Sequence, residues 1–123
     1  MSANMKVKAL RVPCSVVGID DIWAFCEEHE GEKDFDIGKA PGFRYPHFAP
    51  GCVAERDYLD LVLSEKVAPP EREHFAKHRK MKKKERRKYF GKFRKLFPEL
   101  DPKAVRRVHY CFYDGVEPPD VYD

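Results

Sequence analysis

The sequence predicts an α+β fold: a small sheet that includes the N-terminal and C-terminal strands, packed by about three helices, one of them long and basic. Three observations lead to this prediction. In residues 5–12 and 108–113 the side chains repeat with a period of two residues, as in strands that have one buried face. Residues 20–30 repeat apolar side chains at helical spacing. Residues 70–97 form a long basic segment bounded by prolines.

The first strand and first helix follow from local signals. Pro13 favours an edge position, a break or a bulge after the strand at 5–12, because proline cannot donate to a strand ladder. Asp20 suits a helix N-cap and Gly31 suits its C-terminal end. Between them the apolar residues follow i, i+3, i+4 and i+7: Ile19, Ile22, Trp23 and Cys26. We therefore expect an amphipathic helix over 20–30.

The middle of the chain is less regular. Residues 32–51 read as a long loop, because glycine and proline recur through it. Its aromatic residues either pin the loop to the core or take part in function: Phe35, Phe43, Tyr45 and Phe48. Residues 53–66 then favour a helix with Tyr58, Leu59, Val62 and Leu63 on one side, although 58–63 alone is also compatible with a strand.

The basic segment at 70–97 predicts a single helix with an unusual arrangement of faces. At helical spacing one arc contains Phe75, Tyr89, Phe90, Phe93, Leu96 and Phe97. Arg79, Lys82 and Arg86 lie on that same arc. Since cations cannot pack flat on an apolar core, the middle of the helix must project, contact phosphate or contact acids. Asp101-Pro102 then starts a short helical turn before the strand at 108–113.

Charge is strongly segregated along the chain. Residues 1–65 carry seven basic and twelve acidic side chains, net −5. Residues 66–107 carry seventeen and five, net +12, and residues 108–123 carry four acids and no Lys or Arg, net −4. The total of +3 hides this asymmetry, which suggests a polyanion or an acidic protein as partner. We expect one domain, 1–123, with the acidic tail 116–123 flexible.

The sequence favours a non-enzymatic protein that binds nucleic acid through phosphate contacts, with RNA or single strands preferred to a specific duplex sequence. It contains no helix-turn-helix, zinc-finger or RNP-like motif that would read bases. The expected phosphate contacts are Lys77, Arg79, Lys80, Lys82, Lys83, Arg86, Arg87 and Lys88. Tyr89, Phe43, Tyr45 and His47 are the candidate groups for stacking on bases.

Two alternatives remain open. The protein is a small inhibitor or adaptor that docks on a larger protein, for example a phage- or mobile-element-encoded inhibitor of a nucleic-acid enzyme. Its contact surface is then the basic helix or an acidic stretch formed by Glu27, Glu28, Glu30, Glu32, Asp34 and Asp36. In the second alternative these acids, together with Asp57, Asp60 and the acidic tail, neutralise the basic helix within the fold, and the helix has no binding role.

No pattern predicts catalysis, a metal or a cofactor. His74 and His78 have the i, i+4 spacing of a metal-binding pair, but the H-E-x-x-H glutamate is missing. Cysteines 14, 26, 52 and 111 form no C-x-x-C pair, and we interpret most of them as small buried apolar residues. No apolar run reaches the ~18–20 residues of a membrane span, and we see no secretion signal. An intracellular, cytoplasmic location is therefore expected.

Overall fold

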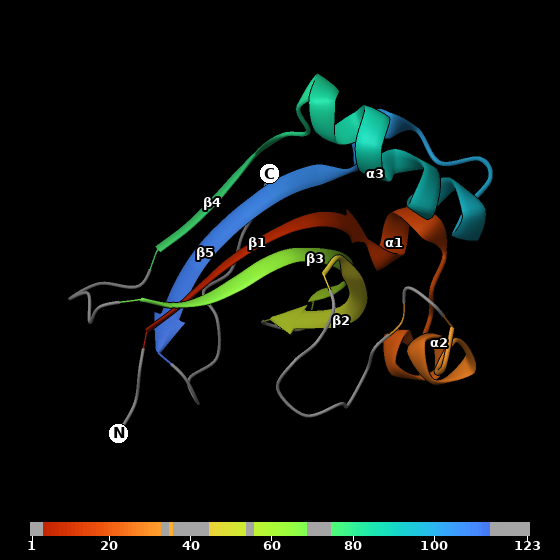
Figure 1. The fold of residues 1–123 in the computed structure, drawn as a ribbon. Coiled ribbons are helices and arrows are strands. Elements are labelled where there is room, and N and C mark those ends of the chain that lie inside the picture. The colour runs from red at the N-terminus through yellow and green to blue at the C-terminus, as the bar shows by residue number, and fades with distance from the viewer. Residues whose placement is uncertain (1–3, 33–34, 36–44, 54–55, 69–74, 114–123) are drawn as a thin grey trace.

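A five-stranded antiparallel sheet forms the centre of the fold (Figure 1). The computed structural model describes residues 4–32, 35, 45–53, 56–68 and 75–113. The strands are β1 (Asn4–Pro13), β2 (His47–Val53), β3 (Arg56–Ala68), β4 (Phe75–Lys80) and β5 (Arg106–Tyr113). Their order across the sheet is β2-β3-β1-β5-β4, so the N-terminal strand is central and pairs with the C-terminal one. The predicted α+β fold and this predicted pairing are both confirmed.

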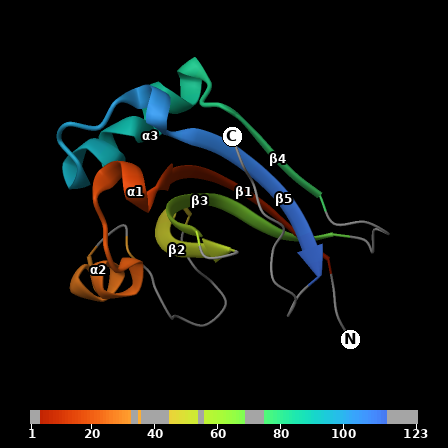
Figure 2. The ribbon, with the colours of Figure 1, turned by 180° about the vertical axis from the view of Figure 1, so that it is seen from behind.

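The helices of the described residues gather at one end of the sheet, as Figures 1 and 2 show from opposite sides. They are α1 (Cys14–Val17), α2 (Ile22–Glu28), α3 (Lys83–Leu96) and the 3-10 turn η1 (Pro102–Ala104). None of them is long and apolar enough to cross a membrane.

Two helix starts are set by aspartate side chains. The helix predicted over 20–30 is confirmed as the shorter α2, but its N-cap is Asp21 rather than Asp20, and Trp23, predicted on the apolar face, is exposed. The Asp21 carboxylate accepts hydrogen bonds from the backbone N–H groups of Trp23 and Ala24, which have no partner within the helix. The short turn predicted after Asp101 is confirmed as η1, where the Asp101 carboxylate plays the same role.

The helix predicted over 53–66 is wrong, because residues 56–68 form strand β3. Leu59 and Leu61 point to one side of the sheet, while Tyr58, Asp60 and Val62 point to the other, and all five are buried. A strand buried on both faces has a nearly continuous apolar run, which does not distinguish it from a helix. The shorter strand considered at 58–63 is the correct alternative.

The long loop predicted over 32–51 is wrong at its C-terminal end, because His47–Val53 is strand β2. Phe35 forms an isolated bridge with Phe48, and their ring centroids are 5.1 Å apart. Both side chains are buried in the core. These two aromatic residues therefore pin the segment to the core, whereas Phe43 lies outside the described residues.

The long basic helix is also wrong at its N-terminal end. Residues 75–80 form the edge strand β4, which pairs with β5, and helix α3 begins only at Lys83. Lysine and arginine are well tolerated on an edge strand, where their charge discourages further strand pairing. The apolar stripe is confirmed only within α3, where Phe90 and Phe93 are buried and Tyr89, Leu96 and Phe97 are partly buried.

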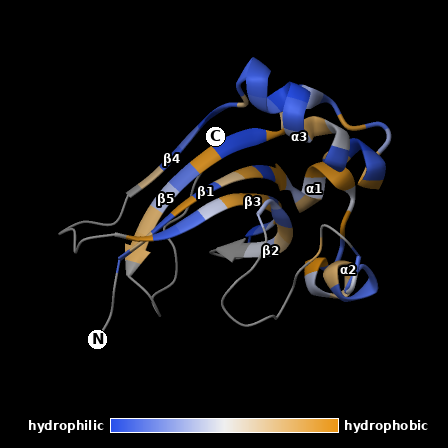
Figure 3. Ribbon diagram, viewed as in Figure 1, coloured by the Kyte–Doolittle hydropathy of each residue, from blue (hydrophilic) through white to orange (hydrophobic). Residues whose placement is uncertain are grey.

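The register divides the sheet into two faces. The helix face carries Leu10, Val12, Leu59 and Leu61, which pack in one core with residues of α2 and α3 such as Cys26 and Phe93. The opposite face carries Ala9 and Val108 in a second, smaller cluster. Figure 3 shows hydrophilic residues along β4 and over much of α3, at one margin of this layered core.

Buried thiols agree with the interpretation of the cysteines as core residues. Cys14, Cys26 and Cys111 are free and buried. Burial raises the pKa of Cys26 to about 11, so its thiolate is scarce near neutral pH. The side chain of Cys52 lies outside the described part of the chain.

Candidate nucleic-acid interface

The start of α3 presents a continuous set of exposed cations. Glu85, in the first turn of the helix, is buried. The six basic residues around it are all exposed: Lys82, Lys83, Lys84, Arg86, Arg87 and Lys88. In the described residues, no carboxylate lies within salt-bridge distance of any of these six side chains. The described acids therefore form no ion pair with these six cations.

Glu85 has a structural task within this basic helix. Its Oε1 accepts a hydrogen bond from the Lys82 backbone N–H at 3.1 Å and so caps the start of α3. The same Oε1 lies 3.7 Å from Arg107 Nη1, and both residues are buried. Glu85 Oε2 and Arg107 Nε have no hydrogen-bond partner. The acid thus offsets Arg107 below the helix and not the exposed cations around it.

The strand β4 divides its predicted phosphate contacts between two faces. Lys77 and Arg79 pair across the strands with His109 and Arg107 on the helix face. Lys80 pairs with Arg106, which places it on the opposite face. Lys77, Arg79 and Lys80 are all exposed. The eight predicted cations therefore do not form one helical surface: α3 and two residues of β4 share a side, and Lys80 faces away.

A hollow of about 430 Å³ lies between α3 and the helix face of the sheet. We call it the lysine hollow. Its lining comes from β1, β3 and the first half of α3: Lys8, Leu63, Ser64, Lys82, Lys84, Glu85, Lys88 and Tyr89. Four lysines thus surround one carboxylate, and that carboxylate already faces Arg107. The predicted residues Lys82, Lys88 and Tyr89 meet here, whereas Lys8 and Ser64 were not predicted.

Local irregularity positions the floor of the lysine hollow. Lys8 pairs with Ser64, and the next pair in the register is Ala9 with Val62, so Leu63 is an extra residue in β3. Such a bulge bends the strand and redirects its side chains. On the helix side, Lys84 and Lys88 are one turn apart on the same face. The Lys88 Nζ lies 5.3 Å from the centroid of the Tyr89 ring.

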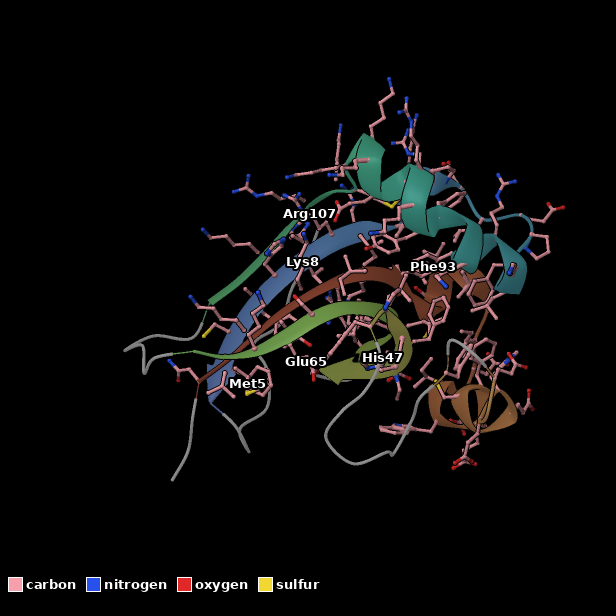
Figure 4. The ribbon with its side chains drawn as sticks, viewed as in Figure 1. Met5, Lys8, His47, Glu65, Phe93 and Arg107 are labelled. Atoms are coloured by element: carbon pink, nitrogen blue, oxygen red, sulfur yellow. The ribbon has the colours of Figure 1, made fainter. Side chains whose placement is uncertain are left out.

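The pKa of His109, on the helix face of β5, depends on the charged residues around the lysine hollow. Its pKa is lowered, first by burial and then by the positive charges of Arg107 and Lys8, with Arg79 adding to them and Glu85 opposing them. Figure 4 shows Lys8 and Arg107 on the neighbouring strands β1 and β5 beside α3. Three cations and one carboxylate therefore act on His109 from this side of the sheet, in addition to its burial.

The predicted stacking residues of the loop differ in their surroundings. Tyr45 is exposed, and its hydroxyl donates to Glu65 Oε2 at 3.2 Å. His47 is only 5% exposed on β2, so the prediction that it stacks on a nucleic-acid base is wrong. Tyr45 and His47 also lie away from the hollow, which neither lines in the described structure.

The acidic stretch does not meet the basic helix within the described residues. Glu27, Glu28, Glu30 and Glu32 are exposed on α2 and just after it. The ion pair of Glu32 is with His29, at 2.9 Å. Asp34, Asp36 and the acidic tail 116–123 lie outside the described residues. Asp60, another acid of that alternative, pairs with Arg11, and within the described residues none of these acids forms an ion pair with the six exposed cations at the start of α3.

The helical spacing expected for His74 and His78 is not seen at His78, which lies on strand β4. His74 lies outside the described residues. No group of three or more His, Cys, Asp or Glu side chains that could hold a metal ion occurs in the described part of the chain.

A larger cavity of about 820 Å³ lies on the opposite face, where β1 meets α1. Arg11, Arg56 and Arg106 line it together with Asp20 and Asp57. Its described lining thus has three arginines against two aspartates, a more balanced charge than the four lysines and one glutamate of the lysine hollow. Comparison of the chain with protein-family models, with curated proteins and with solved structures found no match, so the candidate interface rests on its own geometry.

Proposed function

We propose that this protein binds nucleic acid through the phosphate backbone, without catalysing a reaction on it, and that α3 is the main contact. One observation carries the proposal: the six exposed cations around the start of α3 have no carboxylate partner in the described part of the chain. Clustered lysine and arginine side chains release counterions when they bind phosphates, which drives association.

The surface favours single strands over a duplex sequence code. Base readout in a major groove uses a helix or ribbon whose side chains combine hydrogen-bond donors and acceptors. The exposed side of α3 offers lysine and arginine donors without acceptor side chains beside them, a composition that suits phosphates better than a duplex sequence code. Tyr89 beside Lys88 adds an aromatic ring, and rings of this kind stack on unpaired bases.

Charge reversal on the outer side of α3 tests the proposal. Lys83→Glu with Arg87→Glu reverses two exposed cations one turn apart. The matched control is Lys95→Glu with Lys103→Glu, which are exposed beyond the cluster and change the net charge equally. We expect the first pair to weaken binding to a fluorescent 12-nucleotide RNA about tenfold or more, and the control to change it little.

The salt dependence of RNA binding by the same variants gives a second test of the proposal. For single strands the slope of log K against log salt is about −0.7 per phosphate contact, so the α3 variant should lose about 1.4 of that slope. Failure of the wild-type protein to bind RNA or DNA even at low ionic strength overturns the proposal. Equal losses in the two double variants also overturn it, because net charge alone then explains the binding.

The second candidate function, an inhibitor or adaptor that docks on a larger protein, is favoured by Trp23. This side chain is 56% exposed on α2, next to the acidic residues Glu27 and Glu28. Exposed tryptophans are common anchors of protein interfaces. A stoichiometric, nuclease-resistant partner that is lost with Trp23→Ala but retained with the α3 double variant would favour this function.

A further inference from the structure

The lysine hollow has the composition of a site for a single nucleotide unit, a role that rests on the proposed function and makes it more specific. Its volume of about 430 Å³ falls in the range of pockets for small ligands. Its wall combines three elements that a nucleotide needs. These are cations for the phosphate, a hydroxyl as hydrogen-bond donor, and apolar and aromatic groups for the base.

The cations converge from two different elements. Lys84 and Lys88 come from one side of α3, and Lys8 comes from the central strand β1. Lys8 lies beside the bulge of β3, on a strand that pairs on both sides, so its backbone is held in place before a ligand binds. Cations on separate rigid elements define a point between them, which a row of lysines on one helix does not.

The other walls match a base and its phosphate. The Tyr89 ring and the Leu63 side chain, both partly buried, line the same hollow. Stacking of a base on an aromatic side chain contributes about 1–3 kcal/mol. Ser64 lies opposite Lys8 in the register and offers a hydroxyl that can donate to a phosphate oxygen.

The acid in the hollow does not cancel this preference. Glu85 is engaged through Oε1 with the Lys82 N–H and faces Arg107, so its charge is shared with a residue below the hollow. Lys8, Lys82, Lys84 and Lys88 have no carboxylate partner in the described residues. The local balance in the lining is four positive groups against one negative group.

We propose that the lysine hollow binds one unstacked nucleotide of a single strand, with its phosphate between Lys8, Lys84 and Lys88 and its base against Tyr89 and Leu63. Lys82 lies at the rim and contacts the neighbouring phosphate. The protein therefore distinguishes single strands from duplexes, because a paired and stacked base is not available to enter the hollow.

Substitutions at Tyr89 test the base contact. Tyr89→Leu removes the ring and keeps an apolar residue, whereas Tyr89→Phe keeps the ring. We expect Tyr89→Leu to weaken binding of a 12-nucleotide single-stranded RNA by about 5- to 150-fold, the range that stacking of one base predicts. Binding of the matching duplex should change little. Tyr89→Phe should bind the single strand as the wild type does.

Substitution of Lys8 tests the phosphate contact that β1, rather than α3, provides. Lys8→Gln should weaken single-strand binding and reduce the salt slope by about 0.7, the value for one phosphate. The control is Lys66→Gln, an exposed lysine of β3 on the same face that does not line the hollow. Circular dichroism and thermal unfolding of each variant check that the fold is retained.

The outcomes separate this inference from the proposed function. If the wild-type protein binds neither single strands nor duplexes at low ionic strength, both fail. If it binds but Tyr89→Leu and Lys8→Gln behave as the wild type, only the hollow is overturned. Equal losses of single-strand and duplex binding in Tyr89→Leu also overturn it.

Discussion

Arg11 and Asp60 form a bidentate salt bridge across the central strands β1 and β3, with Nε–Oδ1 at 2.7 Å and Nη2–Oδ2 at 2.8 Å. The two residues are direct partners in the register and are 5% and 3% exposed. The Arg11 guanidinium lies 4.4 Å from the centroid of the Tyr58 ring. Burial acts against the charged form of Arg11, but Asp60 outweighs it, and the net effect raises the pKa of Arg11.

Removal of one partner of this pair should be more damaging than removal of both. Arg11→Met leaves Asp60 buried and unpaired, and Asp60→Leu does the same to Arg11, so each should cost about 3–5 kcal/mol in the free energy of unfolding. The double variant should cost clearly less than the sum, because no buried charge remains. Urea denaturation of the three variants measures the coupling, with Lys66→Met as a surface control within about 0.5 kcal/mol of wild type. Additive losses would contradict a direct interaction.

Glu85→Gln should strengthen nucleic-acid binding while it weakens the fold. The glutamine oxygen still accepts the Lys82 N–H, so the cap of α3 is retained, but one negative charge leaves the lysine hollow. We expect affinity for a single-stranded RNA to rise roughly twofold to fivefold from this one charge. Arg107 loses its counter-charge, which should lower the free energy of unfolding by about 1–3 kcal/mol.

The measurements for Glu85→Gln are fluorescence anisotropy and urea denaturation. Glu99→Gln is the matched control, because Glu99 is exposed after the end of α3 and its loss changes the net charge equally. Unchanged or weaker RNA binding by Glu85→Gln would show that the hollow is not part of the interface.

Much of the fold was predictable because its signals are local. The alternation in β1 and β5 and the helical spacing around Cys26 identified those elements correctly. The segments that were misjudged, β2, β3 and β4, take their structure from strand pairing. Leu59 to Val62 are buried on both faces, which removes the alternation that would reveal a strand. The basic residues of β4 have good helix propensity, and the ladder with β5 holds them extended.

The candidate interface was predictable only in its helical part. The cations of α3 and Tyr89 were identified from the concentration of charge. Lys8 and Ser64 were not, because they join α3 through long-range packing that a single sequence does not reveal. The alternation that separates Lys8 from Val7 and Ala9 was the available signal, since it places Lys8 on a different face from theirs.

His109 should report ligand binding through its titration. Its pKa lies below the ordinary value of 6.5, because of burial and the cations Arg107 and Lys8. Phosphates bound nearby should raise this pKa, which NMR detects as a shift in the titration of the ring Hε1 signal on addition of RNA. The shift should be absent in Lys8→Gln if that lysine holds the phosphate. A His109 pKa that RNA leaves unchanged would contradict binding on this face.

The same residue should give the fold a pH dependence. A lowered pKa in the folded state means that the unfolded chain takes up this proton more readily. The stabilising effect of a neutral His109 is therefore fully present above the unfolded pKa near 6.5 and is lost as the pH falls from there through the lower pKa of the folded state. His109→Gln should reduce the decline in unfolding free energy between about pH 7 and pH 5, measured by urea denaturation. A steeper decline in the variant would contradict a lowered pKa of His109 in the folded state.

Two glycines should respond to alanine in opposite directions. Gly91 is exposed inside α3, and a Cβ built there meets no atom within 4 Å. Gly91→Ala should stabilise the protein by about 1 kcal/mol, since alanine has the better helix propensity. A Cβ at Gly51 would lie 3.2 Å from Asp60 Oδ2. Asp60 cannot retreat easily, because Arg11 holds both of its oxygens, so Gly51→Ala should destabilise the fold.

Thermal and urea unfolding of the two alanine variants distinguish packing from helix propensity. In the background of the Arg11→Met and Asp60→Leu double variant, the penalty of Gly51→Ala should shrink, because leucine has no fixed partner and can change rotamer. The gain from Gly91→Ala should remain the same in that background, since Gly91 lies on a separate element. A Gly51→Ala penalty that is independent of the salt bridge would show that Arg11 does not hold Asp60 in place.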